Sequence, residues 1–206
     1  IFETVRKRGV PIVFIDRVPE IKNVNTVLIN DKLGAFKAIE HAIKIGYRKI
    51  GHFAGYTDIN IGRNRMNGFR EAMNKHKIEI NPDWVIEGGF GENYGYESFM
   101  KLYKANNLPD LIFTVSYPVA LGVYMAASEV GLKIPNDIDV ICFGNAKVQK
   151  FLSPPLSCVD QPTDIIALEA MNILLENIEK RDEGFTPINK VIDTDLILRG
   201  TCIGDN

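Results

Sequence analysis

The chain has 206 residues, and its 46% hydrophobic and 24% charged content is that of an ordinary globular protein. The net charge of −2 argues against a generally basic surface of the kind that binds nucleic acid or anionic membranes. The three cysteines, Cys142, Cys158 and Cys202, are too few and too scattered for a disulfide scaffold or a zinc site. We therefore expect reduced thiols in a cytoplasmic protein.

No signal peptide or long membrane span is visible in the sequence. The most apolar stretch, residues 111–127, is divided by Ser116 and Pro118. These two residues are a helix-start signal, so the stretch predicts a strand followed by a helix. Residues 1–8 have the basic end of a helix, which Gly9 stops. Because a domain rarely begins inside its own helix, we expect the chain to be a fragment of a longer protein.

Along the chain, short apolar runs alternate with segments of helical periodicity. The segment 31–45, for example, starts at a capping Asp31, places apolar residues at helical spacing and ends before Gly46. The predicted strands are 10–16, 26–30, 49–54, 83–87, 111–115, 139–143, 157–160 and one or two within 191–198. The predicted helices are 31–45, 62–77, one that ends near 105, 117–130 and 163–180.

Strands that are separated by helices of this length form βαβ units with right-handed crossovers, so the sequence predicts a parallel α/β fold. The order has one irregularity. The helix 163–180 and the strands after it lie where a first lobe would take its chain back. Two lobes that are joined by several crossings would produce this order.

Seven motifs in a fixed order give the chain a family resemblance. They are G-V-P-I-V-F-I-D-R (9–17), V-L-I-N-D-K-L-G-A (27–35), G-Y-R-K-I-G (46–51), R-M-N-G-F-R-E-A (65–72), G-L-K-I-P-N-D-I-D-V-I-C-F (131–143), S-P-P-L-S-C-V-D-Q-P (153–162) and L-R-G-T (198–201). In this order the chain resembles the LacI/GalR family of sugar-responsive regulators. The segment 153–162 is the most specific of the seven, because it separates these regulators from their periplasmic relatives.

The resemblance implies a two-lobed periplasmic-binding-protein-like fold, in which each lobe is a parallel sheet flanked by helices. Three crossings, near Asn30, Ser157 and Leu198, would form the hinge. Family members also carry a helix-turn-helix headpiece and two earlier βα units, which are missing here, so the first lobe would be incomplete. The implied lobes are 1–29 with 158–197 (N-terminal, partial) and 30–157 with 198–206 (C-terminal).

The function that the resemblance implies is that of a ligand-gated switch. A small effector, a sugar or a sugar derivative, would bind between the lobes of a homodimer and change how the headpieces contact operator DNA. The alternative is a periplasmic sugar-binding protein that feeds a transporter, which shares the fold. A signal peptide upstream would favour the alternative, and a basic helix-turn-helix upstream would favour the regulator.

Candidate ligand-binding residues lie where strands end, because α/β sheets bind ligands beyond the carboxyl ends of their strands. The resemblance makes Arg65 a cleft arginine that donates hydrogen bonds to a ligand oxygen; otherwise it is a surface arginine paired with an acid. Phe90, in the loop after strand 83–87, would stack on a sugar or a base, or else pack on the hinge.

Four further polar or aromatic residues stand at predicted strand ends. Asn30 would face the ligand at the first crossing, while Asp31 caps the next helix. Asp16 follows the first strand and Tyr56 follows strand 49–54, so both are expected to line the site.

Two positions depart from the family pattern. The family usually has a ligand-gripping Asp where Gly144 stands, followed here by Asn145. Ser116 and Tyr117 replace an Asn-Asp or Gly-Asp pair after strand 111–115. The loss of two carboxylates removes strong acceptors for sugar hydroxyls. Either Tyr117 and Asn145 bind a different ligand, or the effector is a protein, or the response is lost.

The sequence gives little support for an enzyme. His41, His52 and His76 have no metal-ligand spacing, and no serine stands in a nucleophile elbow. The glycine-rich segment 88–91 lacks the Lys-Ser/Thr of a P-loop, so we expect a βα loop whose glycines adopt positive φ angles. We therefore predict neither catalysis nor a metal or other cofactor.

Overall fold

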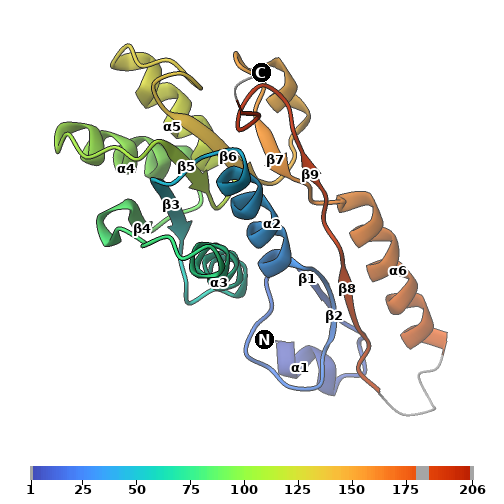
Figure 1. The fold of residues 1–206 in the computed structure, drawn as a ribbon. Helices are drawn as coiled ribbons and strands as arrows, with labels where there is room; N and C mark the ends of the chain where they lie inside the picture. Colours follow the sequence, from blue (N-terminus) through green and yellow to red (C-terminus); the bar gives the residue numbers. More distant parts are fainter. Residues whose placement is uncertain (1, 180–185, 205–206) are drawn as a thin grey trace. The chain divides into compact units, whose positions relative to one another are not determined.

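The computed structural model describes residues 2–179 and 186–204 (Figure 1). The chain divides into two compact units, which we call unit 1 (residues 1–30 and 162–193) and unit 2 (residues 31–161 and 194–206). The chain therefore passes between the units three times, after Asn30, Gln161 and Asp193. Parallel sheets flanked by helices confirm the predicted α/β class. No helix in the described part of the chain has the length and apolar character to cross a membrane.

Unit 1 contains a three-stranded parallel sheet in the order β1-β2-β8, and helix α6 packs on β1 and β2. The buried Asn25 joins distant segments of this unit, because its Nδ2 donates to Ile12 O (3.1 Å) and its Oδ1 accepts from Ile188 N (2.9 Å). Its elements are α1 (Phe2–Lys7), β1 (Val13–Ile15), β2 (Asn25–Ile29), α6 (Thr163–Glu179) and β8 (Asn189–Ile192).

Helix α6 presents an apolar stripe to solvent. Its apolar residues recur every three or four positions, and each residue of this stripe is at least half exposed in the structure. Unit 1 alone does not bury the stripe. Its members are Ile165 (51% exposed), Leu168 (61%), Met171 (56%), Leu175 (50%) and Ile178 (52%).

Unit 2 is built on a six-stranded sheet in the order β4-β3-β5-β6-β7-β9. The first five strands are parallel, and β9 runs antiparallel beside β7. The strands are β3 (Ile50–Gly55), β4 (Val85–Glu87), β5 (Leu111–Thr114), β6 (Asp139–Phe143), β7 (Ser157–Val159) and β9 (Leu196–Ile197). The helices are α2 (Asp31–Lys44), α3 (Asn60–Lys75), α4 (Glu92–Lys104), α5 (Tyr117–Glu129) and the short 3₁₀ helices η1 (Pro82–Trp84) and η2 (Lys147–Phe151).

Helices cover both faces of the unit 2 sheet, which is why its central strands are buried along their whole length rather than at alternate residues. Helices α4 and α5 lie side by side and pack over a core that includes Phe53, Ile112 and Val140 (Figure 1). Helices α2 and α3 pack together and meet the other face, where Phe69 of α3 stacks on His52 of β3.

The glycine-rich segment 88–91 differs from its prediction. Gly91 has a φ of −106°, and neither Gly88 nor Gly89 is among the residues with positive φ, so that expectation is wrong. These glycines supply space instead of unusual backbone angles. A Cβ on Gly88 would collide with the ring of Tyr94, which packs against the core of unit 2.

Candidate functional site

The candidate residues of unit 2 follow neighbouring strands at one edge of its sheet. Phe90 comes after β4, Tyr56 after β3, Tyr117 after β5 and Asn145 after β6, which is the spatial order of those strands. Because these strands are parallel, their carboxyl ends share this edge, where α/β proteins bind ligands. We call it the carboxyl edge.

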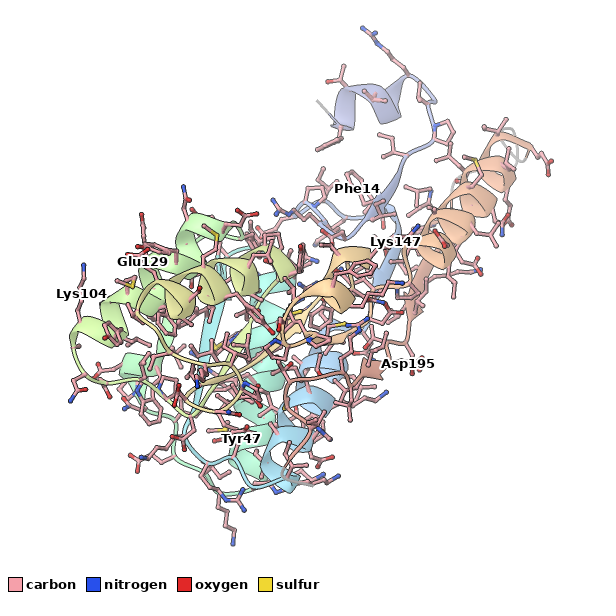
Figure 2. All side chains as sticks on the ribbon, turned by 90° about the horizontal axis from the view of Figure 1, so that it is seen from above. Phe14, Tyr47, Lys104, Glu129, Lys147 and Asp195 are labelled. Carbon is pink, nitrogen blue, oxygen red and sulfur yellow. The ribbon has the colours of Figure 1, made fainter. Side chains whose placement is uncertain are left out.

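The other end of the sheet is distinct. Figure 2 shows Lys147, in the η2 helix that follows β6, well apart from Tyr47, which precedes β3. At this opposite end the Tyr47 hydroxyl donates to the buried carboxylate of Asp139 (2.6 Å), and Cys202 N donates to the same oxygen (2.8 Å). These contacts satisfy Asp139 locally, so the carboxyl edge is the better candidate for a site.

Two aromatic rings form one end of the carboxyl edge. The Tyr56 side chain is 53% exposed, and its ring centroid lies 5.9 Å from that of Phe90 in an edge-to-face arrangement. Gly55 has a φ of +68°, and a Cβ at that residue would lie 2.8 Å from Phe90 Cε1. Ser116 Oγ donates to Phe90 O (2.9 Å), which fixes the loop that carries the ring.

Arg65 lies beneath the edge and is only 2% exposed. Its Nε donates to Asp31 Oδ1 (2.8 Å), its Nη1 donates to Val115 O (2.6 Å), and its guanidinium carbon lies 3.7 Å from the Phe143 ring centroid. Nη2 is 2.8 Å from Asp31 Oδ1, an ion-pair distance, but makes no hydrogen bond within the described chain. Arg65 therefore joins α2, α3 and the ends of β5 and β6, and its partner acid is buried rather than on the surface.

The two departures from the family pattern have defined surroundings. Gly144 has a φ of +93°, and a Cβ there would lie 3.0 Å from Gln161 Oε1, so a larger residue would need Gln161 to move. Asn145 is exposed, and its Oδ1 accepts a hydrogen bond from Arg199 Nη2 (2.7 Å). Tyr117 is half-buried, and burial, reinforced by Glu92, raises the pKa of its hydroxyl.

The other two candidates belong to unit 1. Asp16 follows β1 with a φ of +59°, and Asn30 follows β2, where its N–H donates to Ile192 O (2.9 Å). Both stand at the carboxyl ends of parallel strands, as Tyr56 and Tyr117 do in unit 2. The structure thus groups five of the predicted residues in unit 2 and two in unit 1.

Two residues were missed by the sequence reasoning. Gln161 follows β7 and stands beside Gly144, so it extends the carboxyl edge by one strand. The motif that ends in Asp-Gln-Pro already contained it and was the available signal. Arg199 was also unassigned, since no sequence feature indicates that it reaches Asn145, 54 positions away.

The three histidines have partners away from the carboxyl edge. His52 Nδ1 contacts Phe113 O (2.9 Å), His41 Nε2 contacts Cys202 O (2.8 Å) and His76 Nε2 contacts Glu40 (3.3 Å). Burial lowers the pKa of His52 to about 4, so it is neutral at physiological pH. Among the described residues no group of three His, Cys, Asp or Glu side chains could hold a metal ion.

Known proteins resemble this chain over most of its length. The sequence model of the periplasmic binding protein-like domain matches residues 39–202. The HTH-type transcriptional repressor PurR of Haemophilus influenzae (strain PittEE) is 36% identical over 193 residues, which are 92% of this chain and 56% of that protein. The ribose operon repressor of Haemophilus influenzae (strain Rd) is 30% identical over 195 residues, or 95% of this chain and 56% of that protein.

The fold agrees equally well. The solved complex of the transcriptional regulator CelR with cellobiose superposes with a TM-score of 0.87 at 28% identity, covering 97% of this chain and 61% of that chain. The present chain spans 56% of the length of the curated repressors, little more than half. The chain belongs to the family of periplasmic binding protein-like domains, and within it to the effector-binding domains of the LacI/GalR type.

Proposed function

We propose that this chain is the ligand-responsive domain of a bacterial transcriptional repressor. The single observation that carries the proposal is the carboxyl edge of unit 2, where Phe90, Tyr56, Tyr117, Asn145 and Gln161 follow five neighbouring parallel strands. Aromatic rings and amides gathered at such an edge are the recognition elements of a small polar ligand. The similarity to proteins that are named as repressors supplies the regulatory context.

The ligand class that fits this edge is a neutral sugar or sugar derivative. The exposed ring of Tyr56 and the neighbouring ring of Phe90 offer flat apolar surface for a sugar face or a base. Asn145 and Gln161 offer amides that donate and accept hydrogen bonds, and Gly144 contributes no carboxylate. The relatives point the same way, since one is a ribose operon repressor and one solved neighbour holds cellobiose.

Arg65, Asp16 and Asn30 complete the proposed site. Arg65 Nη2 lies 2.8 Å from Asp31 Oδ1, so a ligand oxygen would share its N–H groups with that carboxylate once the covering side chains move. Asp16 and Asn30 stand at strand ends of unit 1 and would contribute its part of the site. In this proposal the two units correspond to the lobes expected from the sequence, and the three chain passages are the hinge. The second and third passages follow Gln161 and Asp193, whereas the sequence placed them near Ser157 and Leu198.

The proposed mechanism is a shift between an open and a closed population. An effector that contacts both units binds the closed state more tightly, and this difference in affinity sets how far the equilibrium moves. We place operator contact in a headpiece outside this sequence, because the net charge of −2 provides no general basis for binding DNA. The regulator would act in the cytoplasm as a homodimer.

The apolar stripe on α6 supports an additional element of the proposal, an N-terminal lobe that is completed by further βα units. Such a stripe is unusual on the surface of a finished domain. The two alternative functions, a periplasmic transport protein and an enzyme, have no support among the repressor relatives named above.

The test is a calorimetric and thermal-shift screen against ribose, cellobiose, sugar phosphates and purines. A ligand that binds only the folded state must raise the melting temperature. For any hit, Phe90→Ala should weaken binding by more than tenfold because it removes the stacking surface. Tyr103→Ala is the matched control, since Tyr103 is a 39% exposed aromatic on α4 that lies on Phe99 rather than at the carboxyl edge.

Two results would contradict the proposal. One is a hit whose affinity is the same in wild type, Phe90→Ala and Tyr103→Ala, which would move the site away from this edge. The other is the absence of any hit from a folded sample. Sedimentation of the same sample measures the oligomeric state, and a homodimer is the expected result.

A further inference from the structure

Two of the three cysteines are direct neighbours in the unit 2 sheet. Cys142 of β6 and Cys158 of β7 are partners in the parallel register, so their side chains leave the sheet on the same face. Neighbouring strands are about 4.8 Å apart, and a disulfide needs Cα atoms separated by about 4.4 to 6.8 Å. Both thiols are free and fully buried. The backbone therefore already holds them at a separation that a disulfide can span.

Two polar side chains converge on this pair. Arg199 Nη1 lies 3.2 Å from Cys158 Sγ, and Gln149 Nε2 lies 3.3 Å from Cys142 Sγ. A hydrogen bond from Cys142, assisted by the guanidinium of Arg199, lowers the pKa of Cys158 to about 7, whereas burial raises the pKa of Cys142. One thiolate beside one thiol is the combination that reacts with an oxidant and then resolves the product.

The third cysteine is an internal contrast. Cys202 is also fully buried, and its nearest charged group is an anion: burial and the nearby Asp139 carboxylate both raise the pKa of its thiol. An anion beside a thiol disfavours the reactive thiolate, while a cation favours it. The same chain thus contains a buried thiol that is expected to stay inert.

We propose that Cys142 and Cys158 are a redox-active dithiol that closes to an intramolecular disulfide when the chain meets hydrogen peroxide. The Cys158 thiolate attacks one peroxide oxygen, the O–O bond breaks, and hydroxide takes the Cys142 proton to leave as water. Cys142 sulfur then attacks the sulfenic sulfur, an S–S bond forms and the S–O bond breaks. The hydroxide that leaves takes up a proton from solvent, equivalent to the one that Cys158 released on ionising, and becomes a second water. Two thiols lose two electrons, and peroxide gains them.

The surroundings allow this reaction despite the burial of both thiols. Arg199 is only half-buried, and its guanidinium contacts both Cys158 Sγ and the exposed Asn145. Strand β7 has three residues and its outer partner β9 has two, so few ladder hydrogen bonds hold this side of the sheet. The disulfide product adds no atom and the sulfenic intermediate adds only one oxygen, unlike a mixed disulfide with a bulky thiol.

The dithiol is linked to the carboxyl edge through Arg199. The same guanidinium donates to Leu156 O (2.6 Å) and to Asn145 Oδ1 (2.7 Å). Oxidation removes the thiolate that Arg199 faces, so it perturbs the residue that holds Asn145. If the proposed effector site is correct, the oxidised chain binds its effector with altered affinity, but the chemistry of the dithiol does not depend on that site.

The experiment is peptide mapping of the reduced chain after treatment with hydrogen peroxide under native conditions, with remaining thiols blocked by N-ethylmaleimide. Trypsin cuts after Lys147, Lys150 and Arg199, which places the three cysteines in separate peptides. We expect a disulfide between the Cys142 and Cys158 peptides, with Cys202 blocked by the maleimide. Cys202→Ser should form the same link, and Arg199→Gln should form it several-fold more slowly, with its rate rising at higher pH.

Three outcomes would overturn the proposal: three blocked thiols after peroxide, a link that includes Cys202, or Cys158 oxidised to sulfinic acid without a link. Cys142→Ala and Cys158→Ala should each abolish the link. Should either buried substitution prevent folding, Cys202→Ser still decides the question because it leaves the pair intact.

Discussion

Replacing His52 by glutamine should make the protein more resistant to mild acid. His52 is fully buried between the rings of Phe113 (4.7 Å between centroids) and Phe69 (5.1 Å), and its Nε2 has no hydrogen-bond partner within the described chain. Burial lowers its pKa from 6.5 to about 4. The unfolded chain therefore binds a proton on His52 at a higher pH than the folded chain does.

The sign and the size of the effect follow from linkage. The contribution to stability is fully present above pH 6.5 and is lost as the pH falls towards 4, because the unfolded state takes up more protons in that window. The whole difference between the two pKa values is worth about 3 kcal/mol. About 2 kcal/mol of this is lost between pH 7.5 and pH 5, where folded His52 is still mostly neutral.

The assay is urea unfolding at pH 7.5 and pH 5 for wild type, His52→Gln and His76→Gln. Glutamine can still donate to Phe113 O but does not titrate, so His52→Gln should lose about 2 kcal/mol less than wild type on acidification. His76 is a half-buried surface residue beside Glu40, and its replacement should leave the His52 contribution in place. An equal loss in wild type and His52→Gln would refute the reasoning.

Two further substitutions test the packing beneath the carboxyl edge. Asp31→Ala leaves the buried Arg65 charge unpaired and should cost about 3 to 5 kcal/mol of unfolding free energy, measured by urea unfolding. The double variant Asp31→Leu with Arg65→Met removes both charges and should cost much less. Equal losses in the single and double variants would contradict this. Gly34→Ala should lower the melting temperature by several degrees, because the new Cβ would lie 2.6 Å from Thr194 Oγ1. Gly91→Ala is the control and should change the melting temperature little, because nothing lies within 4 Å of its Cβ. A similar melting temperature for both variants would show that Thr194 moves away from the Gly34 position at no cost.

The strands and helices were predictable because each has a local signal. Strand 139–143 and the start of the helix at Asp31 were placed at the residues where the structure has them. The start of β4 was harder to predict: the strand was expected from residue 83, but Pro82 begins a 3₁₀ turn and the strand starts at Val85. Propensity and periodicity are properties of residues that are close in sequence, and the start and end of these elements depend on such residues.

The environment of the site was less predictable because it depends on distant pairs. Asp31 was expected only to cap a helix, yet it also neutralises Arg65, 34 positions away. The position of each residue after a strand was visible in the sequence, and so the carboxyl edge could be anticipated. Which side chains at that edge are already engaged, such as Asn145 by Arg199, depends on strand order and cannot be derived from spacing.

The pairing of β2 with β8 also has a consequence for how the protein is made. Thr26 Oγ1 donates to Asn189 Oδ1 across 163 positions of sequence (2.7 Å), so the pairing of β2 with β8 must wait until β8 has been synthesised. At about 5 to 20 residues per second, the ribosome adds β8 roughly 8 to 33 s after β2. Residues 31–161, with all five parallel strands of unit 2, emerge in that interval. During it the nascent chain carries an unpaired β2 edge, and that edge is where chaperones would be needed.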